Sequence, residues 1–126
     1  MADEGSSDAR RRRRLSRSGD FDRVYRDGTS RGNRFLVLYS FDSGERDQGP
    51  RLGISVGRRI GKAVQRNKVK RTVREAFWSL AEELPGGLDY VIVARPGVEG
   101  LVEREGAAGV RASLHELLAP DEERLS

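Results

Sequence analysis

Residues 61–84 read GKAVQRNKVKRTVREAFWSLAEEL, and this stretch decides how the rest of the chain is interpreted. Apolar side chains recur in it at the three- and four-residue spacing of one helical face. The stripe consists of Val69, Val73, Ala76, Phe77, Leu80 and Leu84. Pro85, Gly86 and Gly87 follow directly, and residues of these types end helices. The pattern predicts one long amphipathic helix over residues 63–84, with Val64 off its buried stripe.

The same helix carries a row of cations beside the apolar stripe. Arg66, Lys70 and Arg74 lie at i, i+4 and i+8, with Asn67 and Arg71 next to them. Like charges at this spacing destabilise an isolated helix by about 0.2–0.5 kcal/mol per pair. Guanidinium groups can hold a phosphate through two parallel hydrogen bonds. The row therefore favours a polyanionic partner over a helix face that is merely solvated.

Charge is distributed unevenly along the 126 residues. The formal net charge is only +4, yet residues 10–34 carry +7 and residues 51–78 carry +8. Residues 79–126 carry −6. Two basic blocks in the first two thirds of the chain predict one positive face, which is typical of proteins that bind nucleic acid.

The composition excludes several classes of protein. The chain has no cysteine, so it can form neither disulfides nor a cysteine-based zinc site, and it has no thiol nucleophile. Its single histidine, His115, excludes multi-histidine metal sites and argues against a Ser-His-Asp triad. No apolar run approaches the roughly 20 residues that span a bilayer. Polar residues follow the Arg10–Arg14 run, unlike a secretory signal, so we expect a soluble cytoplasmic protein.

The chain is expected to form one domain with two unstructured ends. Residues 1–14 lack apolar periodicity and predict a disordered basic arm that adds weak affinity for phosphates. Residues 15–119 contain every periodic segment and form the predicted domain. Residues 120–126 are expected to be a flexible tail.

Shorter patterns around the long helix predict a mixed α+β domain. An apolar face at residues 20–26 predicts a first helix, and residues 110–118 predict a last one. Alternation at residues 34–41 and 51–57, and an apolar run at residues 90–94, predict three strands. One face of the second strand carries only Gly53, Ser55 and Gly57, so we expect a large group to approach the sheet there.

Several motifs in this order resemble the protein component of bacterial ribonuclease P. The central signature is Arg66-Asn67-Lys68, Lys70-Arg71 and Arg74-Glu75, preceded by Gly53-Ile54-Ser55-Val56 and by Arg58 to Val64. Residues 91–96 match a late strand of the family, and the resemblance covers about residues 14–118. Lys68 stands where the family commonly has Arg, which slightly loosens a bidentate contact.

The resemblance implies a two-layer α/β sandwich of order αβββαβα, similar to the second domain of a small-subunit ribosomal protein. Its sheet has four strands, so a short extra strand is expected near Thr29–Gly32. The resemblance also implies a left-handed crossover through the long helix, against the general preference for right-handed connections.

The family's activity is the removal of the 5′ leader from precursor tRNA. The resemblance therefore implies a non-catalytic subunit of this endoribonuclease. It would bind the catalytic RNA in a 1:1 holoenzyme, bind the leader and broaden the range of substrates. The RNA subunit would hold Mg²⁺, and the protein alone would hold no cofactor. No membrane partner is expected.

The resemblance also implies two groups of RNA-contacting residues and no catalytic or metal-binding residue. The expected face for the RNA subunit comprises Arg58, Arg59, Lys62, Arg66, Asn67, Lys68, Lys70, Arg71 and Arg74. The expected leader cleft comprises Phe21, Tyr25, Tyr39, Arg51 and Ser55. Aromatic stacking suits a leader of variable sequence because every base has a π-face. The alternative for these rings, and for Phe21 above all, is core packing.

Two other functions compete with this interpretation. A generic RNA-binding or ribosome-associated protein could share the sandwich without binding a leader. A self-sufficient metal-dependent nuclease would need clustered carboxylates, and the acidic residues gather instead towards the end of the chain. His115 lies between Leu114 and Glu116 in a predicted helix and is interpreted as a surface residue.

Overall fold

The computed structural model describes residues 14–15, 18–44, 50–84 and 87–118. Residues 1–13 of the predicted arm, the helix stop at residues 85–86 and the predicted tail at residues 120–126 lie outside them. The elements are α2 (Ser18–Asp27), β1 (Thr29–Gly32), β2 (Leu36–Asp42), β3 (Arg51–Ser55), α3 (Ala63–Leu80), β4 (Leu88–Ala94) and α4 (Val98–Leu118). Short 3₁₀ turns cover Arg58–Ile60 and Ala81–Glu83. The predicted order αβββαβα is confirmed.

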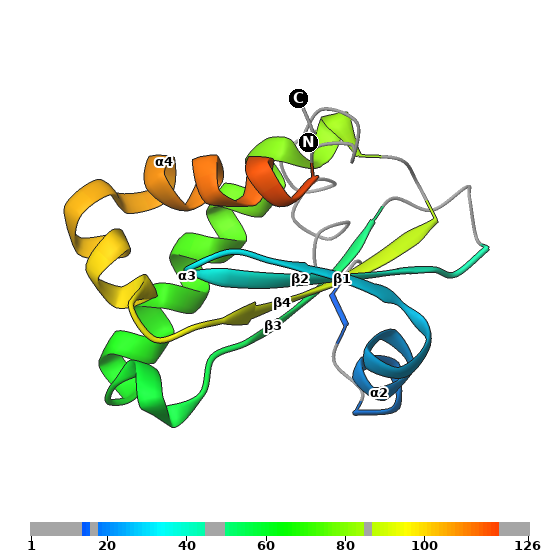
Figure 1. The fold of residues 1–126 in the computed structure, drawn as a ribbon, viewed down its shortest axis with the longest axis horizontal. Helices are drawn as coiled ribbons and strands as arrows, with labels where there is room; N and C mark the ends of the chain where they lie inside the picture. Colours follow the sequence, from blue (N-terminus) through cyan, green and yellow to red (C-terminus); the bar gives the residue numbers. More distant parts are fainter. Residues whose placement is uncertain (1–13, 16–17, 45–49, 85–86, 119–126) are drawn as a thin grey trace, which may run out of the picture.

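The four strands form one mixed sheet in the order β1-β2-β4-β3. β1 pairs with β2 and β2 with β4 in antiparallel fashion, whereas β3 and β4 are parallel. α3 is therefore the crossover between two neighbouring parallel strands. α3 and α4 cover one face of the sheet and α2 covers the other, as Figure 1 shows.

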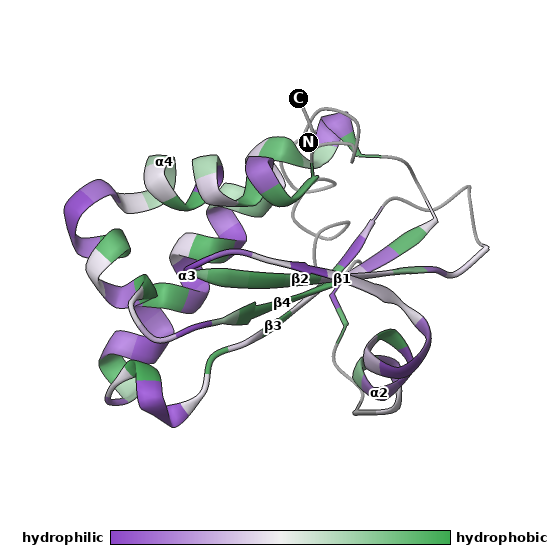
Figure 2. Cartoon of the chain, viewed as in Figure 1, coloured by the Kyte–Doolittle hydropathy of each residue, from purple (hydrophilic) through white to green (hydrophobic). Residues whose placement is uncertain are grey.

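The main core lies between the sheet and the α3–α4 layer. The apolar stripe of α3 is buried there as predicted, with each of these side chains at most 1% exposed: Val69, Val73, Ala76, Phe77 and Leu80. Hydrophobic residues line the inner faces of the elements in Figure 2. Fully burying one such Val, Leu or Phe side chain stabilises the fold by about 1.5–3 kcal/mol. Val64 is 80% exposed and so lies off the stripe, as expected.

A smaller core lies under α2 and explains the glycine on β3. Leu15, Val24 and Val91 are buried there, with Phe21 packed against them. A Cβ on Gly53 would lie 2.5 Å from Cζ of Phe21. The large group that approaches this strand is therefore Phe21 of the same chain. The expected approach of a large group to this bare face of β3 is therefore confirmed at Gly53.

The long helix ends earlier than its apolar pattern predicts. α3 ends at Leu80, and a 3₁₀ turn continues the chain to Glu83. Leu84 has an extended backbone (φ −98°, ψ 141°), and its N–H donates to the carbonyl of Ala81 at 3.1 Å. Leu84 precedes a proline, and the proline ring disfavours helical geometry at the residue before it.

The last helix is longer than predicted and contains a kink. α4 begins at Val98, so the sequence analysis missed its first half. Val98, Leu101 and Val102 are buried on one helical face of that half. Gly106 interrupts the helix with φ 61° and ψ −148°, a conformation almost restricted to glycine. None of the described helices combines the length and apolarity needed to cross a membrane.

Candidate nucleic-acid interface

The cations of α3 lie outside the core on an accessible surface. Asn67, Lys68, Arg71 and Arg74 are exposed, and Arg66 and Lys70 are half-buried beside the apolar stripe. Within the described part of the chain, no carboxylate forms an ion pair with these cations. The structure thus brings the predicted residues of α3 together on one helix as an uncompensated positive surface.

Arg66 has an unsatisfied donor at the start of this surface. Its Nε is buried and has no hydrogen-bond partner among the described residues. A buried donor without a partner costs about 1–3 kcal/mol. A phosphate oxygen would relieve that cost once the half-buried side chain turned outward, which gives Arg66 a physical reason to bind an anion.

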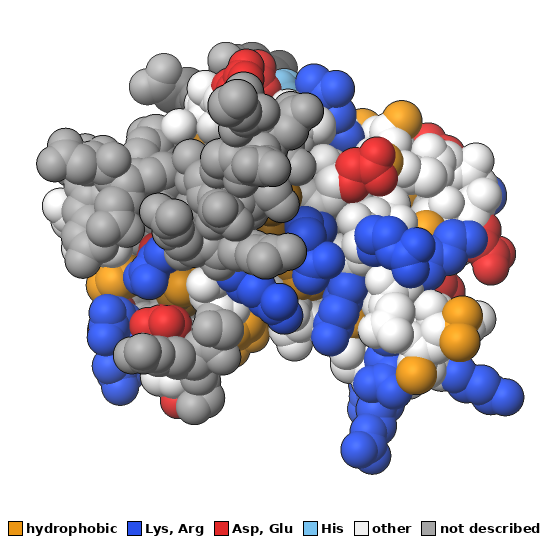
Figure 3. Space-filling model, turned by 180° about the vertical axis from the view of Figure 1, so that it is seen from behind, with side chains coloured by type: hydrophobic (Ala, Val, Ile, Leu, Met, Phe, Trp, Pro, Cys, Tyr) orange, Lys and Arg blue, Asp and Glu red, His pale blue; other side chains and the backbone are white. Residues whose placement is uncertain are grey.

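A tight turn places the remaining predicted cations next to the start of α3. Arg58 and Arg59 occupy the 3₁₀ turn and are exposed, as is Lys62 at the N-cap. Gly61 joins the two helices with φ 149°, and the side chain of Gln65 fills the space where a Cβ would lie. Oε1 of Gln65 accepts a hydrogen bond from the N–H of Lys62 at 3.0 Å. The predicted RNA-subunit residues therefore lie on one continuous segment, from the 3₁₀ turn to Arg74 of α3. Figure 3 shows blue side chains gathered at the lower right, the end of the molecule where α3 begins.

An aromatic cluster lies on the opposite face of the sheet. The rings of Tyr25 and Tyr39 meet edge to face with their centroids 4.9 Å apart. The ring of Phe21 is 6.3 Å from that of Tyr25. Tyr25 is 40% exposed, whereas Phe21 and Tyr39 are half-buried. Tyr25 is thus the most accessible ring of this cluster.

The hydroxyl of Tyr25 links the cluster to β3. Burial raises the pKa of Tyr25 above its usual value of 10.0, and a hydrogen bond with Ser55 acts in the opposite direction. The charges of Tyr39 and Asp22 make smaller contributions that raise the pKa. Tyr25 therefore stays a neutral phenol at physiological pH, able to stack on a base without repelling a phosphate.

Arg51 is set apart from the other predicted cleft residues. Its Nε and Nη2 donate to the two carboxylate oxygens of Asp89 at 2.8 and 2.7 Å, and Asp89 is only 3% exposed. Arg51 and Ser55 share a face of β3 but are about 13 Å apart, at about 3.3 Å per residue. Gly53, covered by the ring of Phe21, lies between them. The structure brings Phe21, Tyr25, Tyr39 and Ser55 together and directs Arg51 to a buried ion pair.

The two candidate surfaces approach each other at the end of β3. Ser55, beside Tyr25, is the last residue of that strand, and the basic 3₁₀ turn begins at Arg58. The sheet separates α2 from α3, yet only two residues separate Ser55 from the turn. One RNA assembly could therefore contact the cleft and the basic helix together.

Sequence reasoning missed the contact that joins the start of the domain to the sheet. Arg14, assigned to the disordered arm, instead forms a parallel bridge with Leu52. The N–H of Leu15 donates to the carbonyl of Leu52 at 2.9 Å, and the side chain of Leu15 is buried. A basic residue next to one apolar residue gives no periodic signal, so periodicity could not have revealed the bridge.

A group of side chains between α3 and α4 was also missed. Glu75, Ser79, Arg111 and His115 line a hollow there, and His115 is exposed as expected. Among the described residues, no three or more His, Cys, Asp or Glu gather as metal ligands. Residues this far apart in sequence, on two helices, have no shared motif that could have found them.

An α+β sandwich with an unpaired basic helix on one face and an accessible aromatic cluster on the other defines a class of RNA-binding protein. A family model described as Ribonuclease P matches residues 9–119. The chain belongs to the family of ribonuclease P protein components, as the resemblance implied.

Similar proteins agree in sequence and in fold. The ribonuclease P protein component of Brevibacillus brevis is 46% identical over 91 residues, which cover 72% of this chain and 71% of that protein. That of Geobacillus thermodenitrificans is 42% identical over 105 residues, or 83% of each chain. The Staphylococcus aureus RNase P protein structure matches with a TM-score of 0.73 at 34% identity, covering 83% of this chain and 91% of that one. The structure of the RNase P protein from Thermotoga maritima matches with a TM-score of 0.72 at 36% identity, covering 81% of this chain and 91% of that one.

Proposed function

We propose that this chain is the RNA-binding protein subunit of ribonuclease P, the endoribonuclease that removes the 5′ leader from precursor tRNA. It assists a catalytic RNA subunit, with which we expect it to form a 1:1 holoenzyme that accepts a broader range of substrates. The observation that carries the proposal is the unpaired cation row of α3, with its unsatisfied Arg66 donor, on the far side of the sheet from the exposed ring of Tyr25.

The basic helix holds the RNA subunit in this proposal. Arginine and lysine that neutralise phosphates release condensed counterions, which supplies sequence-independent affinity. The face comprises Arg58, Arg59, Lys62, Arg66, Asn67, Lys68, Lys70, Arg71 and Arg74. These side chains need no rearrangement of the core to meet RNA, since the buried stripe of α3 is separate from them.

The aromatic cluster holds the leader. Tyr25 offers its accessible ring to a base, and Tyr39 supports that ring from the sheet through an edge-to-face contact. Ser55 fixes the tyrosine through its hydroxyl. Phe21 serves mainly as the packed base of the cluster, because its ring lies against Gly53.

Arg51 contributes to the leader face indirectly. Its guanidinium balances the buried carboxylate of Asp89, whose charge would otherwise repel RNA from this side of the sheet. Chemistry is assigned to the RNA subunit, and the Mg²⁺ ions that assist hydrolysis are expected there. No cofactor is assigned to the protein itself.

Reconstitution with a ribonuclease P RNA tests the proposal. The protein alone should cleave no precursor tRNA, but it should increase cleavage by the RNA at low Mg²⁺. Metal-dependent cleavage that persists in repurified, RNA-free protein would contradict the assignment. Binding to ribosomal particles, with no effect on the ribonuclease P RNA, would favour a generic ribosome-associated protein.

A further inference from the structure

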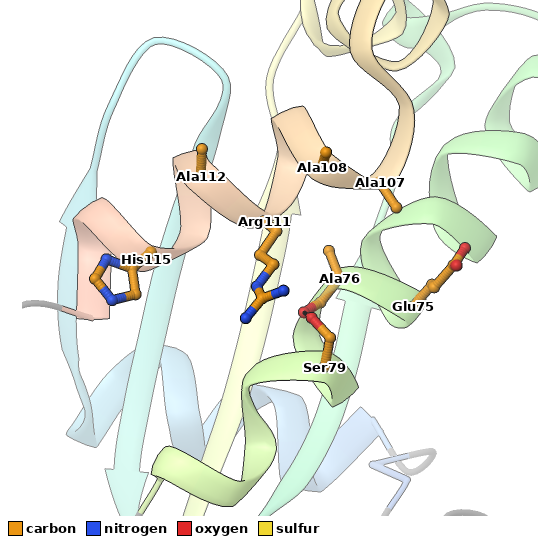
Figure 4. Close-up of a pocket in the computed structure, with 8 residues that line it drawn as sticks. All are labelled: Glu75, Ala76, Ser79, Ala107, Ala108, Arg111, Ala112 and His115. Atoms are coloured by element: carbon orange, nitrogen blue, oxygen red, sulfur yellow. Dashed lines mark hydrogen bonds between the residues drawn. The ribbon is translucent and has the colours of Figure 1, made fainter.

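A hollow of about 590 Å³ lies between α3 and α4, on the other side of the sheet from the aromatic cluster. Figure 4 shows it bordered by α3 on one side and by the second half of α4 on the other. Its apolar lining consists of the methyl groups of Ala76, Ala107, Ala108 and Ala112. The polar side chains around it are Glu75, Ser79, Arg111 and His115. None of these residues has a role in the proposed RNA-subunit face or leader cleft.

The local sequence explains why the two helices leave this space. Gly106 breaks the path of α4, and small residues follow at positions 107–109. Ala76 faces them from α3. Alanine side chains are too short to fill the space between two helix surfaces, so an open hollow remains.

Arg111 and Glu75 are both available to a ligand. The side chain of Arg111 extends from α4 towards α3 across the middle of the hollow, whereas Glu75 lies at the end near Ala107 with its carboxylate directed away from Arg111 (Figure 4). Glu75 is exposed, so rotation of its side chain would bring the carboxylate to a ligand held by Arg111. Neither side chain forms a hydrogen bond or an ion pair with another described residue. A ligand that fits both must present acceptors to the guanidinium and donors to the carboxylate.

Guanine has this arrangement of polar groups on a flat ring. Its O6 and N7 accept two hydrogen bonds from an arginine, and its N1–H and N2 amino groups are donors that a carboxylate can accept. Adenine carries an amino donor in place of O6, so Arg111 would reject it. The hollow is open to solvent rather than enclosed, so it would cover one face of a base, and its alanine methyl groups suit that face.

We propose that the α3–α4 hollow binds an unpaired guanine base of RNA, with Arg111 on its O6–N7 edge and Glu75 on its donor edge. The inference rests on the proposed function for the source of that base, which is the RNA subunit. Lys68 lies seven residues before Glu75, two helical turns away on the same side of α3. A strand held by the basic surface can therefore reach the hollow along one helix.

The test titrates the full-length free protein with guanosine and adenosine 5′-monophosphate while the backbone amides of Ala107, Ala108 and Ala112 are followed by NMR. The guanine nucleotide should bind about tenfold or more tightly than the adenine nucleotide. Arg111→Gln should weaken binding of the guanine nucleotide by a similar factor. Arg104→Gln is the matched control, because it removes the same charge from the same helix outside the hollow. Ala112→Leu should abolish binding by filling the space without changing a charge.

Equal affinity for both nucleotides, or full binding by Arg111→Gln, would overturn the proposal. Inorganic phosphate that reproduces the same shifts would reduce the hollow to a general anion contact and would also overturn it. If millimolar nucleotide caused no chemical-shift changes at these amides, the proposal would also be overturned. The titration uses the free protein, so failure to bind guanine would leave the ribonuclease P assignment intact. Conversely, guanine binding would stand even if the protein failed to assemble with the RNA subunit.

Discussion

The two faces of the sheet use their functional residues in opposite ways. On the α3 side, the buried stripe and the cations are different residues on different faces of one helix. On the α2 side, Phe21 packs against the sheet while Tyr25, four residues later, is 40% exposed. The basic surface can thus be altered without disturbing the core, whereas changes under α2 affect packing and binding together.

The largest expected effect lies in the ion pair beneath the α2 face. Asp89→Ala leaves the guanidinium of Arg51 without its bidentate partner, and breaking a buried pair costs about 3–5 kcal/mol. Since 26% of the Arg51 side chain is exposed, we expect about 3 kcal/mol of lost stability, measured by chemical denaturation. The double variant with Arg51→Met and Asp89→Leu should regain most of the lost stability, because two apolar side chains replace the buried ion pair. A fully stable single variant would show that the pair has no structural role.

The next largest effect is a loss of RNA-subunit affinity on the α3 side without a loss of stability. Arg66→Ala and Arg71→Ala should each weaken binding to the RNA subunit and flatten the dependence of log affinity on log salt by about 0.7–0.9. The melting temperature should change little for Arg71→Ala, whose side chain is exposed, and should not fall for Arg66→Ala, which removes the unsatisfied buried Nε. An unchanged salt slope, or a collapse of thermal stability, would make these residues structural.

The smallest expected effect concerns Lys68, the third residue of the Arg66-Asn67-Lys68 motif. Lys68→Arg should tighten binding to the RNA subunit by less than about 1 kcal/mol, because a guanidinium can form two parallel hydrogen bonds with a phosphate. Lys68→Gln provides the opposite change and should weaken binding. If Lys68→Arg weakens binding as much as Lys68→Gln does, Lys68 does not contact a phosphate.

The sequence predicted α3 well because its stripe is long and regular, and it misplaced the end of the helix because Pro85 acts on Leu84 through backbone sterics. β1 has no apolar alternation, so only the family resemblance indicated Thr29–Gly32. Glycines concealed the first half of α4, since Gly97, Gly100 and Gly106 interrupt the helical signal.

The candidate site was predictable where residues act through their position on one helix. The α3 cations form such a set, and the structure places them together. The partner of Arg51 was not predictable, because Asp89 is 38 positions away and becomes a neighbour only when β3 pairs with β4. The packing of Phe21 on Gly53 likewise depends on how α2 crosses the sheet.

In the proposed holoenzyme the α2 face binds the leader while α3 binds the RNA subunit. The most direct test compares the affinities of precursor and mature tRNA for holoenzyme carrying Tyr25→Ala, at matched salt and with a melting curve. We expect a loss of about 1–3 kcal/mol for precursor tRNA, no change for mature tRNA, and normal assembly with the RNA subunit. Tyr25→Phe, which keeps the ring and loses the hydroxyl, should retain most of the precursor affinity. An equal loss for both tRNAs, accompanied by a lower melting temperature, would contradict the claim and leave Tyr25 as a packing residue.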